Sequence, residues 1–371
     1  RIVSDGDARN ALGSDALTGL PGAFLQTFIG ELFSTPERAA LATQLIGAPL
    51  ALACLDALGQ DKATYGSGGR DELLRRAQIS AVASRHARRG MLELVAALED
   101  KQIPCLAIKG LATAYAYYDA PYLRLLPDAD ILVRQSDLPA LCAHLKAEDY
   151  VSVVDPASDR PWGALTRASF APVTPRESGD FYVDFHRLVI DYPASRGVPT
   201  PELFASARRV DTENGTLSVP SAEHSFLILA LHAFRDFYEP RGLKALFDAA
   251  FLLARQPPDW SLVEAMARRG RSVRRTIFYR DLLAEFGIAG AEGLFAGRSL
   301  GAPSHTLVQT IAANMRSLAL PRLPDGLKLR LEMRLYDSPL HLVLRNGERL
   351  AGLVIRRTHD LPGLPIEKAE A

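Results

Sequence analysis

Short apolar runs alternate with helix-like segments through the middle of the chain. Each run is five to nine residues long and rich in β-branched or aromatic residues, which is typical of strands. Between the first two runs and between the second and third, apolar positions instead recur every three or four residues, which predicts helices. The pattern therefore predicts strands at 103–108, 129–133, 150–154 and 181–189, with helices at 111–118 and 137–147.

Helical periodicity dominates both sides of this region. It covers 21–58, where Thr35-Pro36 is typical of a helix start, and 71–100; it returns from Ser221 to about residue 290 and, with loops, over 300–355. We therefore expect an α+β fold: a small mixed-sheet core flanked by N-terminal and C-terminal helical regions. The expected divisions are 1–100, 101–220 and 221–371.

The connecting segments are rich in glycine, proline and asparagine. Asn214-Gly215 between two short strands predicts a hairpin, and the glycine-rich stretch before Asp71 predicts a linker. The proline-rich stretch 155–180 predicts a loop or hairpin over the sheet, and residues 362–371 a frayed tail.

Two aspartates on the second predicted strand give the first chemical signal. Asp128 and Asp130 are two residues apart, so their side chains leave the strand on the same face. Apolar neighbours mark a core strand, where a carboxylate is costly unless it is paired or bound to a cation. The spacing therefore indicates a magnesium site.

A third carboxylate lies on the last predicted strand. Asp184 and His186 again share a face, and Asp184 would meet the other two acids if the strands are neighbours. Such a layout suits two-metal phosphoryl or nucleotidyl transfer, with Asp184 activating the acceptor hydroxyl. His186 either contacts the nucleotide, orients Asp184 or is an ordinary core histidine.

A lysine and a glycine follow the first predicted strand. Gly110 would allow a tight turn and close approach of a phosphate, and Lys109 would supply positive charge. Arg124, four residues before Asp128, either clamps a triphosphate, pairs with a site carboxylate or is a surface arginine.

Composition narrows the partners and the compartment. The chain has 43 basic and 43 acidic residues, so there is no global field that favours nucleic acid or membrane surfaces. The three cysteines lie far apart without a CxxC pair, which argues against a zinc site or a disulfide framework and favours a reducing cytoplasm. The most apolar stretch, 45–58, contains Pro49 and Asp56 and is too short to span a bilayer.

Taken together, these motifs resemble a known family. Lys109-Gly110, Arg124, Asp128-x-Asp130 and Val183-Asp184-x-His186 are similar to the uncharacterised nucleotidyltransferase family of the polymerase-β-like superfamily, over roughly Leu92 to Leu253. The resemblance implies a nucleoside triphosphate substrate and two Mg²⁺ ions held by Asp128, Asp130 and Asp184. It also implies that Lys109, Gly110, Arg124 and His186 bind the nucleotide.

The acceptor and two other functions stay open at this point. The acceptor is a small molecule, a peptide or protein, or a tRNA. A glycosyltransferase would use Asp-x-Asp to hold a nucleotide-sugar, and in it Asp184 need not share the metal site. A non-catalytic nucleotide sensor would fit Leu111, which follows Gly110 where the superfamily usually has serine or glycine. His224, His232, Lys244 and Asp248 either line an acceptor pocket or join helix to helix.

Overall fold

The computed structural model describes most of the chain with side chains. The described residues are 17, 19–58, 66–154, 170–190, 193–236, 242–318, 335–338, 340 and 364–368. Predictions that fall on 1–16, on most of 155–180 and on most of 319–363 lie outside these ranges.

A mixed sheet forms the centre of the α+β fold. Its strands are β1 (Cys105–Ile108), β2 (Asp128–Val133), β5 (Tyr182–His186), β4 (Val173–Pro175), β3 (Tyr150–Val154) and β8 (Ile366–Lys368), in that spatial order. The β2–β5 and β3–β8 pairs are parallel, whereas β1–β2, β5–β4 and β4–β3 are antiparallel. The predicted α+β class is confirmed.

Helices and a hairpin complete the sheet region. Helix α6 (Lys109–Ala116) joins β1 to β2, and α7 (Leu138–Ala147) joins β2 to β3. The predicted Asn214-Gly215 turn joins β6 (Arg208–Thr212) to β7 (Gly215–Val219), which form a separate two-stranded sheet next to β1. Short helices η3 (Pro121–Leu123), η4 (Gln135–Asp137), η6 (Ala194–Arg196) and α8 (Thr200–Ala205) fill the connections.

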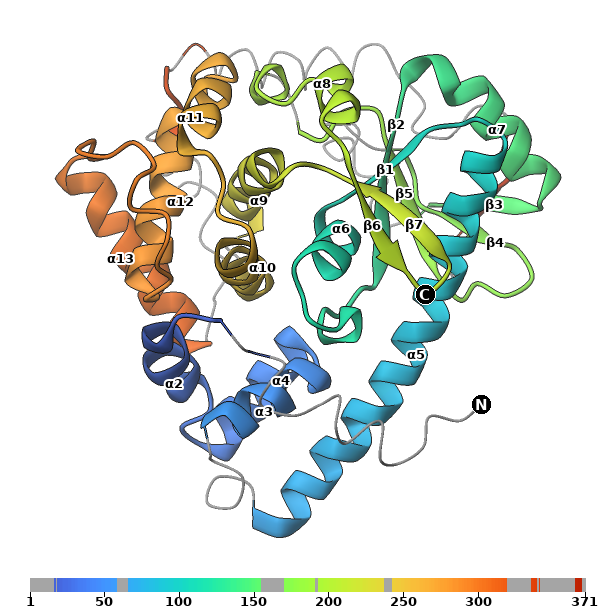
Figure 1. Cartoon of the computed structure of the whole chain (residues 1–371). Helices are drawn as coiled ribbons and strands as arrows, with labels where there is room; N and C mark the ends of the chain where they lie inside the picture. Colours follow the sequence, from blue (N-terminus) through green and yellow to red (C-terminus); the bar gives the residue numbers. More distant parts are fainter. Residues whose placement is uncertain are drawn as a thin grey trace.

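The flanking regions are helical, as their periodicity predicts. The N-terminal side has η2 (Phe24–Ile29), α2 (Gly30–Leu32), α3 (Pro36–Ile46), α4 (Ala48–Leu58) and α5 (Gly66–Asp100). The C-terminal side has α9 (Ala222–Asp236), α10 (Gly242–Arg255), α11 (Trp260–Arg269), α12 (Val273–Glu285) and α13 (Ala302–Ser317). In Figure 1 the C-terminal helices stand on the left and the strands on the right, with α6 between them.

Two expectations at the ends of elements are wrong. The linker predicted before Asp71 is the first turn of α5, which begins at Gly66 and packs against α4. Helix extension is cooperative, so the strongly helical residues that follow favour this additional turn. The tail predicted to fray contains β8: the Ser152 amide donates to the Pro365 carbonyl at 2.9 Å, and Ile366 pairs with Ser152. Backbone pairing with the open edge of β3 orders this segment.

The start of α3 follows its sequence signal closely. Thr35 has an extended backbone, its hydroxyl accepts a hydrogen bond from the Arg38 amide at 3.3 Å, and Pro36 occupies the first helical position. A hydroxyl cap of this kind stabilises a helix by about 1 kcal/mol.

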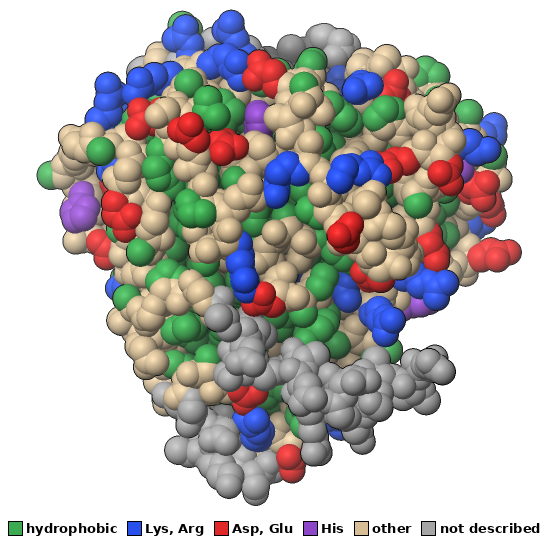
Figure 2. Space-filling model, viewed as in Figure 1, with side chains coloured by type: hydrophobic (Ala, Val, Ile, Leu, Met, Phe, Trp, Pro, Cys, Tyr) green, Lys and Arg blue, Asp and Glu red, His purple; other side chains and the backbone are tan. Residues whose placement is uncertain are grey.

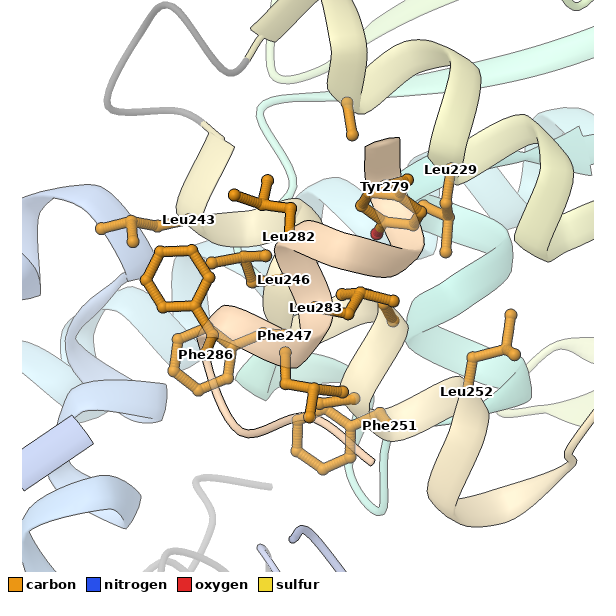
Figure 3. Packing of buried hydrophobic residues seen from close by; sticks show 14 of the residues in the cluster. Leu229, Leu243, Leu246, Phe247, Phe251, Leu252, Tyr279, Leu282, Leu283 and Phe286 are labelled. Atoms are coloured by element: carbon orange, nitrogen blue, oxygen red, sulfur yellow. The ribbon is translucent and has the colours of Figure 1, made fainter. Parts of the chain in front are cut away.

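Two hydrophobic cores lie on opposite faces of the sheet. One joins the second half of α5, α6 and α7 to one sheet face, and the other joins the N-terminal and C-terminal helices to the opposite face. Figure 3 shows the second core where α9, α10 and α12 meet, with Phe247, Phe251 and Phe286 packed between the helices. The two helical regions, far apart in sequence, therefore share one interior.

Candidate functional site

The pairing of β2 with β5 brings the predicted acids together. The two strands run parallel, with Asp130 directly opposite Asp184 and Leu132 opposite His186. Cα partners in adjacent strands project to the same side of a sheet, so Asp128, Asp130, Asp184 and His186 share one face. The sequence predicts the spacing of the acids along each strand, but it does not predict that these two strands are neighbours.

Burial shows which face this is. Along β2, Ala129, Ile131 and Val133 belong to the core under α5 and α7, whereas Leu132 belongs to the core of the helical regions. Side chains alternate along a strand, so the acids project to the same side as Leu132. The acidic face of the sheet is therefore turned towards the C-terminal helices.

Lys109 makes an ion pair with the central aspartate. Ile108, at the end of β1, pairs with Asp130, which places the next residue beside that carboxylate. The Lys109 ammonium lies 2.5 Å from Asp130 Oδ1, with 20% and 13% of the two side chains exposed. Lys109 has a φ of 54°, a left-handed conformation that costs a non-glycine residue about 1–2 kcal/mol. The turn after β1 thus holds the lysine over Asp130 in a strained conformation.

Asp130 has a second partner on β5. Nε2 of His186 lies 2.7 Å from the same Oδ1 atom, and only 5% of the histidine side chain is exposed. Burial opposes ionisation of Asp130, but Lys109 and His186 outweigh it and hold the pKa of this carboxyl well below its usual range. Burial, together with the charge of Lys109, lowers the pKa of His186. The acid is therefore ionised and the ring is neutral near pH 7.

Asp128 has the opposite electrostatic environment. Burial and then the neighbouring charge of Asp130 raise its pKa, while Lys109, Arg124 and Lys244 oppose that rise. Lys244 is half-buried on α10, so the helical region contributes a positive charge near Asp128. Two carboxylates that are two residues apart thus have pKa values shifted in opposite directions, a feature frequent at functional sites.

Gly110 lies in a closely packed turn. A Cβ atom there would lie 2.8 Å from Leu126 Cδ2 and 3.5 Å from Arg124 Nη2. The residue with a positive φ in this turn is Lys109, not Gly110. The glycine lets the start of α6 lie against the chain that enters β2, and so fixes the position of Lys109 relative to Asp130.

Arg124 pairs with an acid of the helical region. Its Nε donates to Asp248 Oδ1 at 2.8 Å and its Nη2 to Oδ2 at 3.0 Å, while Nη1 donates to the Leu125 carbonyl at 2.8 Å. Asp248 on α10 is 2% exposed and also accepts from the Tyr118 hydroxyl at 2.8 Å. Arg124 is therefore not a surface arginine, which was one of the expected roles. It does pair with a carboxylate, but that carboxylate belongs to Asp248 and not to Asp128 or Asp130.

The two histidines of α9 have separate partners. His224 Nδ1 lies 3.0 Å from the Ser221 hydroxyl and 3.2 Å from that of Ser206, and His232 Nε2 lies 2.6 Å from the Val189 carbonyl. These contacts join α9 to neighbouring segments, which is the structural alternative that the sequence left open.

The cluster of donors fits a divalent cation. Among the residues with described positions, Asp130, Asp184 and His186 each offer a ligand atom within 4.8 Å of the others, and Asp128 lies outside this group. Carboxylate oxygens and a neutral imidazole nitrogen are ordinary ligands of divalent metals. Sequence reasoning placed His186 at the nucleotide; its closeness to Asp130 depends on strand register, for which the sequence holds no signal.

Comparison with known proteins assigns the chain to a class. A sequence model described as "Uncharacterised nucleotidyltransferase" matches residues 39–287, which is more than half of the chain. No curated protein matches the sequence. In the described part of the chain, no helix has the length and apolar character needed to cross a membrane.

Proposed function

The chain belongs to the family of uncharacterised nucleotidyltransferases, and we propose that it moves a nucleoside monophosphate from a nucleoside triphosphate to a hydroxyl or phosphate of an acceptor, with release of pyrophosphate. One observation carries this proposal: Asp130 faces Asp184 across two parallel strands, with the Lys109 ammonium on the same carboxylate. Carboxylates and a lysine that converge in this way suit a magnesium-triphosphate substrate.

Asp128, Asp130 and Asp184 would hold two Mg²⁺ ions. Bound there, Mg²⁺ would neutralise triphosphate charge and make the acceptor hydroxyl more acidic. Asp184 would take the proton of that hydroxyl as its oxygen attacks the α-phosphorus and the bond to pyrophosphate breaks. Lys109 would place its ammonium on the phosphates at the N-terminus of α6, where Gly110 allows the turn to lie close to Arg124.

The helical region is positioned to complete the site. The acids face its core, and Lys244 of α10 brings a positive charge near Asp128. Arg124 would support the site indirectly, because its Nε and Nη2 groups donate to Asp248. His186 would support the nucleotide site through its contact with Asp130.

The face of the molecule shown in Figure 2 does not identify the acceptor. Basic and acidic side chains are interspersed over most of this face. A small molecule, a peptide or protein, and a tRNA therefore all stay candidates. The three cysteines are free and buried, which fits work in a reducing cytoplasm.

The place of Asp184 favours nucleotidyl transfer over a sugar transferase. In a glycosyltransferase that uses Asp-x-Asp, the third carboxylate need not share the site, whereas here Asp184 is the strand partner of Asp130. A nucleotide sensor would bind the nucleotide with the same residues but would not turn it over. The assay below therefore distinguishes a sensor from an enzyme.

The test is label transfer from each α-labelled ribonucleotide in the presence of Mg²⁺ and cell lysate. We expect label on the enzyme, a protein, an RNA or a small molecule with wild-type protein, and none with Asp184→Asn. Asp211→Asn, an exposed acid on β6, is the matched control and should behave as wild type. Consumption of a nucleotide-sugar instead, or a nucleotide-induced thermal shift without Mg²⁺ dependence or turnover, would refute the proposal.

A further inference from the structure

His186 lies where a metal ligand would lie. Its Nε2 is 2.7 Å from Asp130 Oδ1, and one ring nitrogen of His186 and one oxygen each of Asp130 and Asp184 lie within 4.8 Å of one another. Two donors bound to one cation are held about 3 Å apart by bond lengths near 2.1 Å, so these separations need only small adjustments.

The surroundings of the ring favour this role over an ordinary core histidine. The His186 side chain is 5% exposed, yet its Nε2 contacts the Asp130 carboxylate, and Asp184 lies in the same group of donors. The opposite nitrogen, Nδ1, is buried, and the ring also interacts with the Leu188 backbone. A metal-bound Nε2 leaves the ring proton on Nδ1, on the side away from the carboxylates.

The donor set distinguishes among divalent cations. Mg²⁺ prefers an all-oxygen octahedron and keeps several waters, whereas Mn²⁺ accepts carboxylate oxygens together with an imidazole nitrogen. A site with two carboxylates and one imidazole therefore favours Mn²⁺ over Mg²⁺ more than a site with three carboxylates does. The nitrogen also removes one negative charge from the ligand set relative to a third aspartate.

From this geometry we propose that His186 Nε2 is a direct metal ligand beside Asp130 and Asp184, and that this position prefers Mn²⁺ to Mg²⁺. The inference deepens the proposed nucleotidyl transfer and rests on it for its biological meaning. The cation and the Lys109 ammonium compete for Asp130 Oδ1, because the ammonium lies 2.5 Å from that atom. Occupation by metal therefore releases Lys109 towards the triphosphate.

The test detects the nitrogen itself. Mn²⁺ is titrated into the full chain without nucleotide, and electron spin-echo modulation is recorded on the bound ion. We expect the ¹⁴N coupling of a directly bound imidazole, converted to a ¹⁵N pattern when histidine is ¹⁵N-labelled. The labelled wild-type protein alone decides whether a histidine is bound, so the test does not depend on a variant that folds.

Variants then identify the residue. In His186→Gln the nitrogen signal should vanish and Mn²⁺ affinity should fall about 10- to 100-fold, with a smaller change for Mg²⁺. His224→Gln, at a buried histidine of α9, is the matched control and should keep both signal and affinity. Absence of Mn²⁺ binding, binding without a nitrogen coupling, or an unchanged Mn²⁺-to-Mg²⁺ ratio in His186→Gln would each overturn the inference.

The two proposals fail separately. A nitrogen signal without label transfer would refute nucleotidyl transfer and leave the metal ligand in place. Label transfer by a protein whose Mn²⁺ has only oxygen ligands would refute the role of His186 alone.

Discussion

Asp248 of α10 and Arg124, six residues before Asp130, form a buried bidentate ion pair. The carboxylate is 2% exposed and receives Nε at 2.8 Å and Nη2 at 3.0 Å. The Tyr118 and Thr113 hydroxyls donate to the same carboxylate, so α6 joins the pair as well. Because a Cβ on Gly110 would lie 3.5 Å from the guanidinium, this pair also supports the turn that carries Lys109.

Removing one partner of this pair should destabilise the fold strongly. Asp248→Ala leaves the Arg124 guanidinium buried without its counter-ion, so we expect a loss of about 3–5 kcal/mol in the free energy of unfolding. Urea unfolding followed by circular dichroism measures it. The double variant Arg124→Met/Asp248→Leu should lose much less than Asp248→Ala, since no charge is then left buried. A loss below 1 kcal/mol in Asp248→Ala would show that water reaches the guanidinium.

A methyl group at Gly110 should disturb the same turn by contact. Its Cβ would lie 2.8 Å from Leu126 Cδ2, closer than packed carbons approach, so Gly110→Ala should cost about 1–3 kcal/mol. Leu126→Val removes the opposing methyl group. In a double-mutant cycle, Gly110→Ala/Leu126→Val should therefore be more stable than the sum of the single effects. Strict additivity would mean that the strain arises from Arg124 or from the backbone.

The fold was predictable where local pattern determines it. The strands over Cys105–Ile108 and Asp128–Val133 and the helix start at Thr35-Pro36 follow from spacing and capping within a few residues. The short strand β8 was not predictable, because three residues become a strand only through pairing with an edge more than 200 residues earlier in the chain. The shared core of the two helical regions likewise depends on contacts between distant segments.

The candidate site likewise has features that local sequence predicts and features that depend on distant contacts. The common face of Asp128 and Asp130 follows from strand geometry, and the Lys109-Gly110 turn from its place after an apolar run. The pairing of Asp130 with Asp184 depends on the register of two strands, and the partner of Arg124 lies 124 residues away. Sequence periodicity holds no information about either contact, which is why the roles of His186 and Arg124 stayed open.

Aromatic contacts between the helical regions should make them unfold together. The Phe28 and Phe286 rings lie 4.4 Å apart between centroids, and Phe24 lies 5.3 Å from Phe247. Phe28→Ala should cost about 3–5 kcal/mol and should speed hydrogen exchange in α12 although the substitution is in η2. Leu41→Ala, at a side chain 46% exposed, is the control and should change stability by less than about 0.5 kcal/mol. Faster exchange confined to η2 would contradict a common unfolding unit.

The two aspartates of β2 should respond to neutralisation with opposite signs. The pKa of Asp128 is raised by burial and by Asp130, so its folded form favours the proton more than its unfolded form does. Its contribution to stability is full below the unfolded pKa and is lost as pH rises through the folded pKa. Asp128→Asn should therefore raise Tm at pH 7 in the presence of EDTA, with a gain that shrinks towards pH 3.

Asp130→Asn is the matched variant with the reverse expectation. Lys109 and His186 hold the pKa of Asp130 well below its usual range despite burial, so its contribution is present above the unfolded pKa and is lost as pH falls. This variant should lower Tm at pH 7, and its deficit should also shrink towards pH 3, where the unfolded carboxyl takes up its proton. Thermal unfolding of both variants across this range measures the two trends. A Tm shift of the same sign in both at pH 7 would mean that the Lys109 ammonium is shared equally between the two acids.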